Sequence, residues 1–414
     1  YIGTPYCLPT EPDRCGFCLF PSEVYQGRHQ LDTYLRYLQR EGEMYQQYFE
    51  GSDLASIYFG GGTSNLYKAD QYDRLLAIVR RTLGRLPDGV EITLEGIPQL
   101  FTLEKLTAMK AAGINRISIG VQQLDDEMIK LSGRKQKAAH VLQTIAWCHD
   151  LGLPCSVDLI FGWPRQTVDL MLRDLASLVA AGVPHLTHYE LNVAGRTDFA
   201  RNRRDELPST AQNLELYRLS RDFLRTHGYR QVTAYDWTKA ADGLPVDFQY
   251  EQAWHRPLRA EDNGVAGMDA WGWGFAGISF FLGGPTAPGW AYMNAVRVEE
   301  YFRRLDAGQF PIERGFRYGA KDVRLTVLFQ MLQGMQVDLI EYEKIFEVDL
   351  VEEYAEIWEG LSEQGWIAVT DNTLRIVGDG VFYTPLIQGL LAEERREELR
   401  KAAKTGTAME SLPG

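Results

Sequence analysis

The sequence is poor in cysteine, in net positive charge and in long apolar runs. Only five of its 414 residues are cysteine, which excludes a small scaffold stapled by disulfides. The formal charge of −13 excludes the broad positive surface that nucleic-acid backbones require, so we expect no nucleic-acid partner. No apolar run approaches the roughly 18–20 residues that span a bilayer, and no signal-peptide pattern stands before Cys7. We therefore expect a cytoplasmic protein without a membrane partner.

The cysteines that are present fall into two kinds. Cys148 and Cys155 lie in apolar stretches, which is typical of buried structural cysteine. Cys7, Cys15 and Cys18 are instead crowded near the start of the chain, with gaps of seven and two residues between them.

Three clustered thiols are one ligand short of a four-ligand metal site. A structural zinc site needs four ligands, and the nearest histidine is His29. Three thiolates can instead bind three irons of a 4Fe–4S cluster and leave the fourth iron open for a substrate or cofactor. The sequence favours the cluster, with a zinc site as the remote alternative.

Short apolar segments alternate with amphipathic segments up to about residue 193. The apolar segments, which predict strands, cover residues 1–6, 55–60, 91–94, 116–120, 155–160 and 185–191. The amphipathic segments, which predict helices, include residues 31–49, 71–83, 103–112, 138–151 and 167–181, and a further one follows at 210–227. Six such units predict an α/β fold built on a partial (β/α)6 TIM-like barrel, with a doubly wound open sheet as the alternative. In either layout the chemistry lies at the carboxyl ends of the strands.

The middle of the chain has a weaker pattern. Residues 231–235 predict a strand, and residues 238–290 are rich in glycine and aromatic residues without clear periodicity. Because disordered segments are poor in aromatics, we expect a packed irregular cover there. Its aromatic residues could form the wall of a flat, apolar substrate pocket or an ordinary core; they are Trp254, Trp271, Trp273, Phe275, Phe280, Phe281, Trp290 and Tyr292.

The last quarter resembles a small α+β winged-helix-like module. The pattern there predicts helices at residues 322–333, 339–346 and 350–364 and a hairpin at 366–369 and 373–377. A charged helix that begins at residue 393 is followed by a tail without a clear pattern. The domains we expect are a barrel core (1–195), a barrel extension and cover (196–318) and a C-terminal helical, winged-helix-like module (319–414).

A glycine triplet follows the second predicted strand. The sequence there reads Tyr58-Phe59-Gly60-Gly61-Gly62-Thr63-Ser64-Asn65. Glycine lets bare backbone amides approach a ligand, although a triplet by itself can be just a tight strand-to-helix turn. After a strand, in a chain with an open three-cysteine site, it indicates contact with a bound cofactor.

Five short motifs stand in order over the first half of the chain. They are Tyr1-Ile-Gly-Thr-Pro-Tyr-Cys7, Phe59-Gly-Gly-Gly-Thr-Ser64, Glu95-Gly-Ile-Pro98, Asn115-Arg-Ile-Ser-Ile-Gly-Val-Gln122 followed by Arg134, and Val157-Asp-Leu-Ile-Phe-Gly-Trp-Pro164. The set resembles the radical S-adenosylmethionine (SAM) superfamily. Within it, the motifs are similar to the group that contains oxygen-independent coproporphyrinogen III dehydrogenase, its haem-chaperone relative and the class C radical methyltransferases.

The resemblance implies a role for each matching residue. Cys7, Cys15 and Cys18 would bind a 4Fe–4S cluster, and SAM would chelate the open iron. The residues implied to contact the cofactor are Tyr1, Phe17, Gly60, Gly61, Gly62, Thr63, Glu95, Gln122, Arg134 and Asp158. An arginine suits a carboxylate because its fork binds both oxygens. Taken alone, Glu95 or Asp158 could be a helix cap or an ion-pair partner, and Gln122 could be structural.

The chain also departs from the family. Its first cysteine gap is longer than usual, so the residues between Cys7 and Cys15 are expected to bulge outward. Leu19-Phe20 stands where the dehydrogenase has a further cysteine, which argues against that activity. Residues 262–276 lack the histidine of the haem chaperone; His255 lies nearby but suits a surface or core position better.

We therefore expect a class C radical SAM enzyme that methylates or cyclopropanates an unsaturated or aromatic carbon of a small molecule. The resemblance implies two SAM molecules, one cleaved to a 5′-deoxyadenosyl radical and one supplying the carbon, and an external electron donor such as flavodoxin or ferredoxin. The alternative is a porphyrin- or haem-modifying enzyme or a haem-trafficking protein. Since the cofactors carry out the difficult chemistry, the main contribution of the protein is to bind and orient the cofactors and the substrate.

Overall fold

The computed structural model describes residues 1–12, 14–193, 195–239, 248–250, 259–261, 264–266, 269–283 and 289–405. Among these residues, no helix combines the length and the apolar character needed to cross a membrane.

A curved sheet of nine strands forms the centre of the described chain, in the order β13-β1-β4-β5-β6-β7-β8-β10-β9. Its parallel strands are β1 (Ile2–Thr4), β4 (Ser56–Gly61), β5 (Glu91–Gly96), β6 (Arg116–Gln122), β7 (Cys155–Phe161) and β8 (His185–Glu190). These six confirm the predicted partial barrel and exclude the doubly wound alternative, since consecutive strands are neighbours throughout. At one edge β13 (Trp273–Gly274) pairs parallel to β1; at the other, β10 (Asp236–Thr238) and β9 (Arg230–Gln231) are antiparallel.

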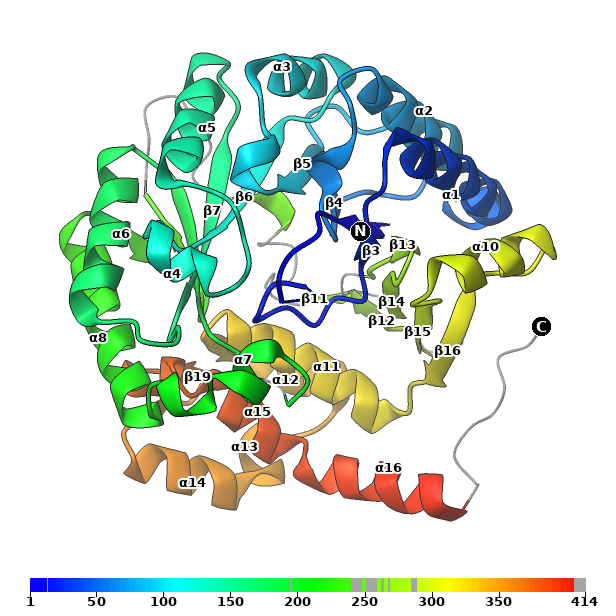
Figure 1. Cartoon of the computed structure of the whole chain (residues 1–414). Helices are drawn as coiled ribbons and strands as arrows, with labels where there is room; N and C mark the ends of the chain where they lie inside the picture. The colour runs from blue at the N-terminus through cyan, green and yellow to red at the C-terminus, as the bar shows by residue number, and fades with distance from the viewer. Residues whose placement is uncertain are drawn as a thin grey trace.

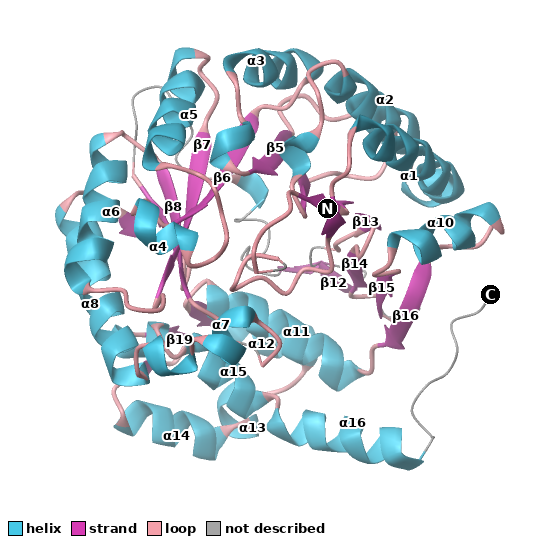
Figure 2. Cartoon of the chain, in the orientation of Figure 1, coloured by secondary structure: helices cyan, strands magenta, loops and turns pink. Residues whose placement is uncertain are grey.

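Helices cover the outer surface of this sheet (Figures 1 and 2). The main ones are α1 (Arg28–Phe49), α2 (Gln71–Leu83), α3 (Leu103–Ala112), α5 (Ala138–Asp150), α6 (Val168–Ala180) and α8 (Thr210–Thr226). Short helices stand in the loops: η1 (Ser64–Leu66), η2 (Pro98–Leu100), α4 (Asp126–Lys130), α7 (Asp198–Asn202) and η3 (Arg204–Glu206). Periodicity predicted the long helices to within about three residues at each end, because each buries one apolar face against the sheet.

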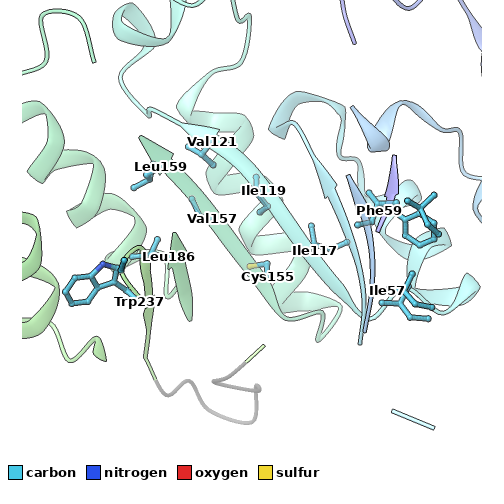
Figure 3. Packing of buried hydrophobic residues seen from close by; sticks show 14 of the residues in the cluster. Ile57, Phe59, Ile117, Ile119, Val121, Cys155, Val157, Leu159, Leu186 and Trp237 are labelled. Carbon is cyan, nitrogen blue, oxygen red and sulfur yellow. The ribbon is translucent and has the colours of Figure 1, made fainter. Parts of the chain in front are cut away.

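Strand alternation separates an apolar outer face from a polar inner face. The buried apolar side chains that Figure 3 labels on the sheet are Ile57, Phe59, Ile117, Ile119, Val121, Cys155, Val157, Leu159, Leu186 and Trp237. Each fully buried aliphatic side chain of this kind contributes roughly 1.5–3 kcal/mol. Since successive side chains of a strand point to opposite faces, their neighbours Tyr58, Ser118, Asp158 and Thr187 face the inside of the barrel. The buried Cys148 and Cys155 belong to the apolar layer, as predicted.

The aromatic segment is more regular than the sequence indicated. β14 (Ile278–Phe281), β15 (Trp290–Asn294) and β16 (Ile312–Arg317) form an antiparallel sheet, and β11 (Arg259–Glu261) pairs with β12 (Gly264–Ala266). The expectation of an irregular cover was therefore wrong for these stretches, because strands this short leave little periodicity to read. Residues 231–235 were also predicted wrongly: they mostly form the turn between β9 and β10.

A buried carboxyl group joins this segment to the barrel. Glu41 on α1 accepts hydrogen bonds from the backbone N–H of Gly274 (2.9 Å), from Asn294 Nδ2 (2.8 Å) and from the hydroxyl of Tyr301 on α10 (Val298–Asp306). Burial raises the pKa of Glu41 to about 7. Three donors on three elements thus converge on one side chain of the first long helix.

The C-terminal part has the element order of a winged helix. It comprises α11 (Ala320–Gln333), β17 (Gln336–Asp338), α12 (Leu339–Phe346), α13 (Leu350–Glu353), α14 (Ala355–Glu363), β18 (Ile367–Val369) and β19 (Thr373–Ile376), with the strands ordered β17-β19-β18. After these come η4 (Gly378–Val381), α15 (Thr384–Leu391) and α16 (Glu393–Thr405). The sequence missed β17 and α15, and the helix predicted at 350–364 is two helices separated at Tyr354.

The module lies against the open side of the barrel, where α11 crosses the lower part of Figure 1. A backbone hydrogen bond from Ala234 N to Gln333 O (2.9 Å) connects the β9–β10 turn to the end of α11. The division at residues 195 and 318 remains our proposal; the main sheet itself continues past the first boundary through β9, β10 and β13.

Candidate active site

The three clustered cysteines lie at the carboxyl ends of the strands. Cys7 ends β2 (Tyr6–Cys7), which pairs with β3 (Glu23–Val24), and Cys15 and Cys18 lie in the intervening loop. Neighbouring segments fix this loop: Gly16 donates its N–H to Ser132 O (3.1 Å) and accepts from Phe199 N (3.0 Å). Cys15 and Cys18 are therefore held by contacts from outside the loop rather than by regular secondary structure.

Polar groups surround the sulfur atoms. Thr63 Oγ1 donates to Cys7 Sγ (3.4 Å), and Arg134 Nε lies 3.4 Å from Cys15 Sγ. Burial raises the pKa of Cys7 and of Cys18, and the charge of Cys15 acts in the same direction on both.

This donor set suits a cluster better than a single ion. Within the part of the chain that the structure describes, no three His, Cys, Asp or Glu side chains are close enough to hold one metal ion. An iron–sulfur cluster places each cysteine on a different iron, so its ligands stand further apart. Three thiols, a hydroxyl donor and a guanidinium group fit a 4Fe–4S cluster.

The long loop between Cys7 and Cys15 packs against the segment that carries Arg134. Gly133 has φ +80°, and a Cβ added to it would lie 2.6 Å from the backbone oxygen of Glu11. The inserted residues are thus in contact with the position before the arginine that meets Cys15.

The glycine triplet brings β4 against the strand that leads to Cys7. Gly62 N donates to Thr4 O (2.8 Å), and Thr63 N donates to Tyr6 O (2.9 Å). A Cβ on Gly62 would lie 2.6 Å from Tyr6 O. These two amides donate hydrogen bonds to backbone oxygens of the protein. The glycines therefore position the segment that leads to Cys7, in addition to any contact with a cofactor.

Arg134 is oriented by the end of β6 and by an aromatic ring. Its Nη1 donates to Gly120 O (2.6 Å) and to Gln136 Oε1 (3.2 Å), and its guanidinium lies 5.4 Å from the centre of the Phe17 ring. Phe17 in turn packs on Trp163, with ring centres 5.2 Å apart. The side chain between the two cysteines of Cys15-Gly-Phe-Cys18 therefore links the cysteine loop to Arg134 and a small apolar cluster.

Glu95 and Asp158 form an acidic pair inside the barrel. Tyr58 OH donates to Glu95 Oε2 (3.3 Å), and Ser118 Oγ donates to Asp158 Oδ2 (3.1 Å). Burial, and next the charge of Asp158, raise the pKa of Glu95 to about 8. At neutral pH Glu95 thus holds a proton that it can donate in a hydrogen bond.

Gln122 sits on a β-bulge. The register between β6 and β7 shifts between Gly120 and Gln122, and Gln122 has φ +66°, a value uncommon outside glycine. A bulge of this kind re-aims a side chain and is common beside active sites. The ring of Tyr1 stacks on Tyr58 with centres 5.8 Å apart, and a Cβ added at Gly60 would lie 2.7 Å from the Tyr1 hydroxyl and 2.8 Å from Glu95 Oε2.

A central cavity of about 810 Å³ connects this acidic pair with the C-terminal module. Its lining comprises Tyr58, Glu95, Gln122, Asp158, Ile160, Thr187, Tyr189, Tyr235, Asp236, Tyr250 and Phe280 from the barrel and cover, and Thr326, Phe329, Gln330, Gln333 and Gln388 from the module. The size suits a small-molecule site. No lysine, arginine or histidine is among these described lining residues, whereas three carboxyl groups are.

The predicted site residues thus fall into two neighbouring groups. Glu95, Gln122 and Asp158 line the central cavity, whereas the cysteines, Thr63 and Arg134 gather at the loops above it. Tyr1 also lines a different cavity, at the opposite end of β4, but its hydroxyl lies beside Gly60 and Glu95. Alternation along the strands could have found Tyr58, Thr187 and Tyr189; nothing local marks the residues from the module.

The aromatic stretch has a mixed role. Phe280 lines the central cavity, Trp273 and Phe275 are buried in the core, and Trp271 and Phe281 line the cavity that holds Tyr1. Phe20, at the position where the dehydrogenase has a cysteine, packs edge-on against Phe275 (6.0 Å between centres). Trp254 and His255 lie outside the described residues.

Comparison with known proteins agrees with this arrangement. Residues 8–193 match the family model described as the Radical SAM superfamily. The chain is 25% identical over 389 residues to the oxygen-independent coproporphyrinogen III oxidase of Escherichia coli (strain K12), covering 92% of this chain and 82% of that protein. It is 30% identical over 240 residues to the heme chaperone HemW of the same strain, covering 58% of this chain and 62% of the chaperone, so it spans less than two thirds of that relative.

Among solved structures, the Escherichia coli coproporphyrinogen III oxidase (HemN), described as a radical SAM enzyme, is similar with a TM-score of 0.79 at 22% identity. The superposition covers 94% of this chain and 89% of that one, so the shared fold includes the C-terminal part. The chain therefore contains a radical SAM domain at residues 8–193, the domain of enzymes whose cofactors are a 4Fe–4S cluster and SAM, and it is similar over most of its length to the coproporphyrinogen III oxidase.

Proposed function

We propose that this enzyme modifies a porphyrin-type macrocycle by SAM-dependent radical chemistry. One observation carries the proposal: the similarity to coproporphyrinogen III oxidase extends over 92% of the chain, and so includes the module that closes the central cavity. The methyl or methylene transfer that the sequence suggested has no counterpart in the names of the relatives described above, so the porphyrin alternative takes precedence.

The cofactors would be held by the residues that the motifs indicated. Cys7, Cys15 and Cys18 would bind the cluster, and Arg134 would neutralise negative charge beside it. The SAM contacts would come from the rim of the barrel, namely Gly60, Gly61, Gly62, Thr63, Glu95, Gln122 and Asp158, with Tyr1 and Phe17 behind them. When bound and reduced by an external electron donor, the cluster supplies the electron that cleaves SAM.

The chain itself supplies a space for the substrate that is partly walled by aromatic rings. Tyr250 stacks on Tyr58 with ring centres 4.3 Å apart, and Phe280 and Phe329 complete an apolar wall. Such walls keep water from reactive intermediates. Protonated Glu95 can donate a hydrogen bond, while Asp236 is held by Thr187 Oγ1 and Thr233 Oγ1 (both 2.7 Å) and can accept one.

The reaction should differ from that of the coproporphyrinogen oxidase. Phe20 replaces a cysteine of that enzyme's motif, and the described lining of the cavity offers no cation to a carboxylate side chain. We therefore infer that the uncharged ring, and not its acidic side chains, enters the cavity.

Anaerobic turnover tests the proposal. The reconstituted enzyme, with reductant and SAM, is incubated with coproporphyrinogen III, protoporphyrin IX or haem, and 5′-deoxyadenosine and product masses are measured. At least one macrocycle should accelerate 5′-deoxyadenosine formation and change mass. If none does either, the proposal is wrong.

A matched pair of variants locates the substrate. Phe329→Ala should lower turnover of the macrocycle at least tenfold, because Phe329 lines the cavity. Phe302→Ala removes an equally partly buried ring, which stacks on Tyr37 away from the cavity, and should leave turnover unchanged. Equal effects of both variants would exclude the cavity as the substrate site.

The second candidate is the class C transfer with two SAM molecules. The observation that favours it is the presence of Asp158 and Asp236 in a cavity whose described lining has no basic residue, since SAM is a sulfonium cation. With methyl-labelled SAM, this candidate requires label in the product and formation of S-adenosylhomocysteine. Unlabelled product formed together with 5′-deoxyadenosine excludes it.

A further inference from the structure

A second cavity, here named the arginine cleft, lies between the edge of the barrel and the C-terminal module. It has a volume of about 780 Å³ and is bounded by α8 and β9 on one side and by the turn at residues 334–336 and β19 on the other. In the described part of the chain it shares no lining residue with the central cavity, so the two are distinct sites.

Positive charge reaches the cleft from both walls. Arg221, Arg225 and Arg230 come from the barrel edge and Arg375 from β19, while no Asp or Glu is among its described lining residues. Arg221 and Arg225 stand four residues apart on α8 and so share one helix face. In a chain with a net charge of −13, such a local concentration of arginine attracts anions.

Two of these arginines keep their donors available. Arg221 Nε is 3.0 Å from Asp222 Oδ1 and its Nη1 is 3.9 Å from Asp379 Oδ1, so Arg221 is partly neutralised from outside the cleft. Arg225 and Arg375 are exposed and make no ion pair with any residue that the structure describes. A guanidinium group can bind two oxygens of a carboxylate or phosphate at once.

The floor between the arginines is apolar. Tyr217, Tyr229, Ile376 and Val381 line it and are buried. Met335, at the edge of the floor, follows the end of α11 and has φ +60°, the left-handed conformation that commonly ends a helix. An apolar floor with guanidinium groups on facing walls fits a ligand that is itself amphipathic.

We propose that the arginine cleft binds a small amphipathic polyanion, consisting of a flat apolar body with two or more carboxylate or phosphate groups. Arg225 and Arg375 bind the anionic groups from opposite walls, and the body lies on Tyr217 and Ile376. This site is separate from the one at which radical chemistry is proposed and does not depend on the nature of that reaction.

Titration with soluble probes tests the site. Coproporphyrin III carries carboxylates on an aromatic ring, and ADP carries phosphates on an aromatic base; adenosine lacks the anions and pyrophosphate lacks the body. Binding to the full chain is followed by calorimetry or fluorescence at fixed low salt. We expect coproporphyrin III or ADP to bind at least tenfold more tightly than adenosine and pyrophosphate, and the preferred probe identifies the source of the anion.

Variants assign the binding to the cleft. Arg225→Gln/Arg375→Gln should weaken the preferred probe at least tenfold, whereas Arg225→Lys/Arg375→Lys should retain most of the affinity. Arg36→Gln/Arg85→Gln changes the net charge equally at exposed positions outside the cleft and should leave binding unchanged. Far-UV circular dichroism checks that each variant is folded.

Three outcomes would overturn the proposal. In the first, neither coproporphyrin III nor ADP binds more tightly than adenosine and pyrophosphate. In the second, the Arg225→Gln/Arg375→Gln variant binds the preferred probe as tightly as the wild type, and in the third, the Arg36→Gln/Arg85→Gln variant loses as much affinity as the Arg225→Gln/Arg375→Gln variant. If coproporphyrin III bound only in the central cavity, the Arg225→Gln/Arg375→Gln variant would bind it as tightly as the wild type, because the two cavities share no described lining residue.

Discussion

The central cavity and the arginine cleft are similar in volume, about 810 and 780 Å³, but opposite in charge. The first is walled by inward-facing strand residues and contains Glu95, Asp158 and Asp236; the second is walled by α8 and β19 and contains four arginines. Both are closed by the C-terminal module.

The difference between them shows how depth decides the state of a charged group. In the barrel, burial and next the charge of Asp158 raise the pKa of Glu95 to about 8, so Glu95 keeps a proton at neutral pH. At the surface junction, Arg225 and Arg375 remain solvated and carry their charge without a partner among the described residues. A protein can therefore hold a hydrogen-bond donor at one site and a full charge at the other.

The largest expected effect is at the cluster. Cys15→Ala should remove iron and sulfide binding and abolish SAM cleavage, while affinity at the arginine cleft stays as in the wild type. Iron content, absorption near 400 nm and 5′-deoxyadenosine formation provide the measurements. Cys148→Ala, at a buried cysteine of the apolar layer, should keep the cluster. Retained SAM cleavage by Cys15→Ala would contradict the ligand assignment.

The next effect concerns the glycine triplet beside Cys7. Gly62→Ala should destabilise the fold by about 1–3 kcal/mol, because the added Cβ would lie 2.6 Å from Tyr6 O. This oxygen belongs to the backbone and cannot shift without moving the neighbouring chain. Gly360→Ala is the matched control: no atom lies within 4 Å of its added Cβ, so it should stabilise α14 by about 0.5–1 kcal/mol. Denaturant unfolding measures both. Equal and small effects would show that the backbone at Gly62 is not packed this closely.

Glu41 is a buried carboxyl group that accepts three hydrogen bonds, so the fold should be sensitive to the loss of one of its acceptor oxygens. Glu41→Gln places an amide against Gly274 N, Asn294 Nδ2 or Tyr301 OH, and leaving one donor unpaired costs about 1–3 kcal/mol. Chemical unfolding of the variant gives the value. An unchanged midpoint would show that the three donors do not depend on Glu41.

Glu95→Gln should change the pH dependence of stability. The folded pKa of Glu95, about 8, exceeds its ordinary value of 4.5, so between these values the folded state binds more protons than the unfolded state. Its contribution to the free energy of unfolding is therefore full below pH 4.5 and is lost, at up to about 1.4 kcal/mol per pH unit, as pH rises to about 8.

The glutamine variant does not titrate, so its stability should fall less steeply than that of the wild type over this window. Unfolding of the cofactor-free protein in parallel buffers compares the two slopes. Parallel slopes would mean that Glu95 is not held protonated by burial.

The smallest effect is expected at the mouth of the arginine cleft. Arg218 pairs with Asp379, but both side chains are partly solvated, and solvent screens such pairs. Arg218→Gln should leave the unfolding midpoint unchanged within error. A clear loss of stability would show that the charges around the cleft hold the module to the barrel rather than serve a ligand.

Most of the barrel could be predicted from the sequence, because its information is local. The helices at residues 71–83 and 103–112 are found with the predicted ends, and each predicted parallel strand is present. The candidate residues Glu95, Gln122 and Asp158 also lie together, since the carboxyl ends of parallel strands meet at one edge. Their roles toward SAM remain predictions.

Other parts could not be predicted for equally physical reasons. β13 is a two-residue strand that exists only because Trp273 and Gly274 pair with Ile2 and Gly3, far away in sequence. β17 is likewise a short strand fixed by β19. The hydrogen bonds that Gly62 N and Thr63 N donate to Thr4 O and Tyr6 O could not be predicted, because they depend on the path of another strand.

The sequence by itself determined the alternation of the strands, the polar inner face of the barrel and the three-cysteine segment, since each follows from periods of two or 3.6 residues or from short motifs. The tertiary structure decided where the cavities lie. Tyr58 meets Tyr250, and Arg225 and Arg375 enter one cleft, only after the cover and the module have packed onto the barrel. Such pairs are more than 100 residues apart, and only the burial of apolar surface between the packed elements brings them together.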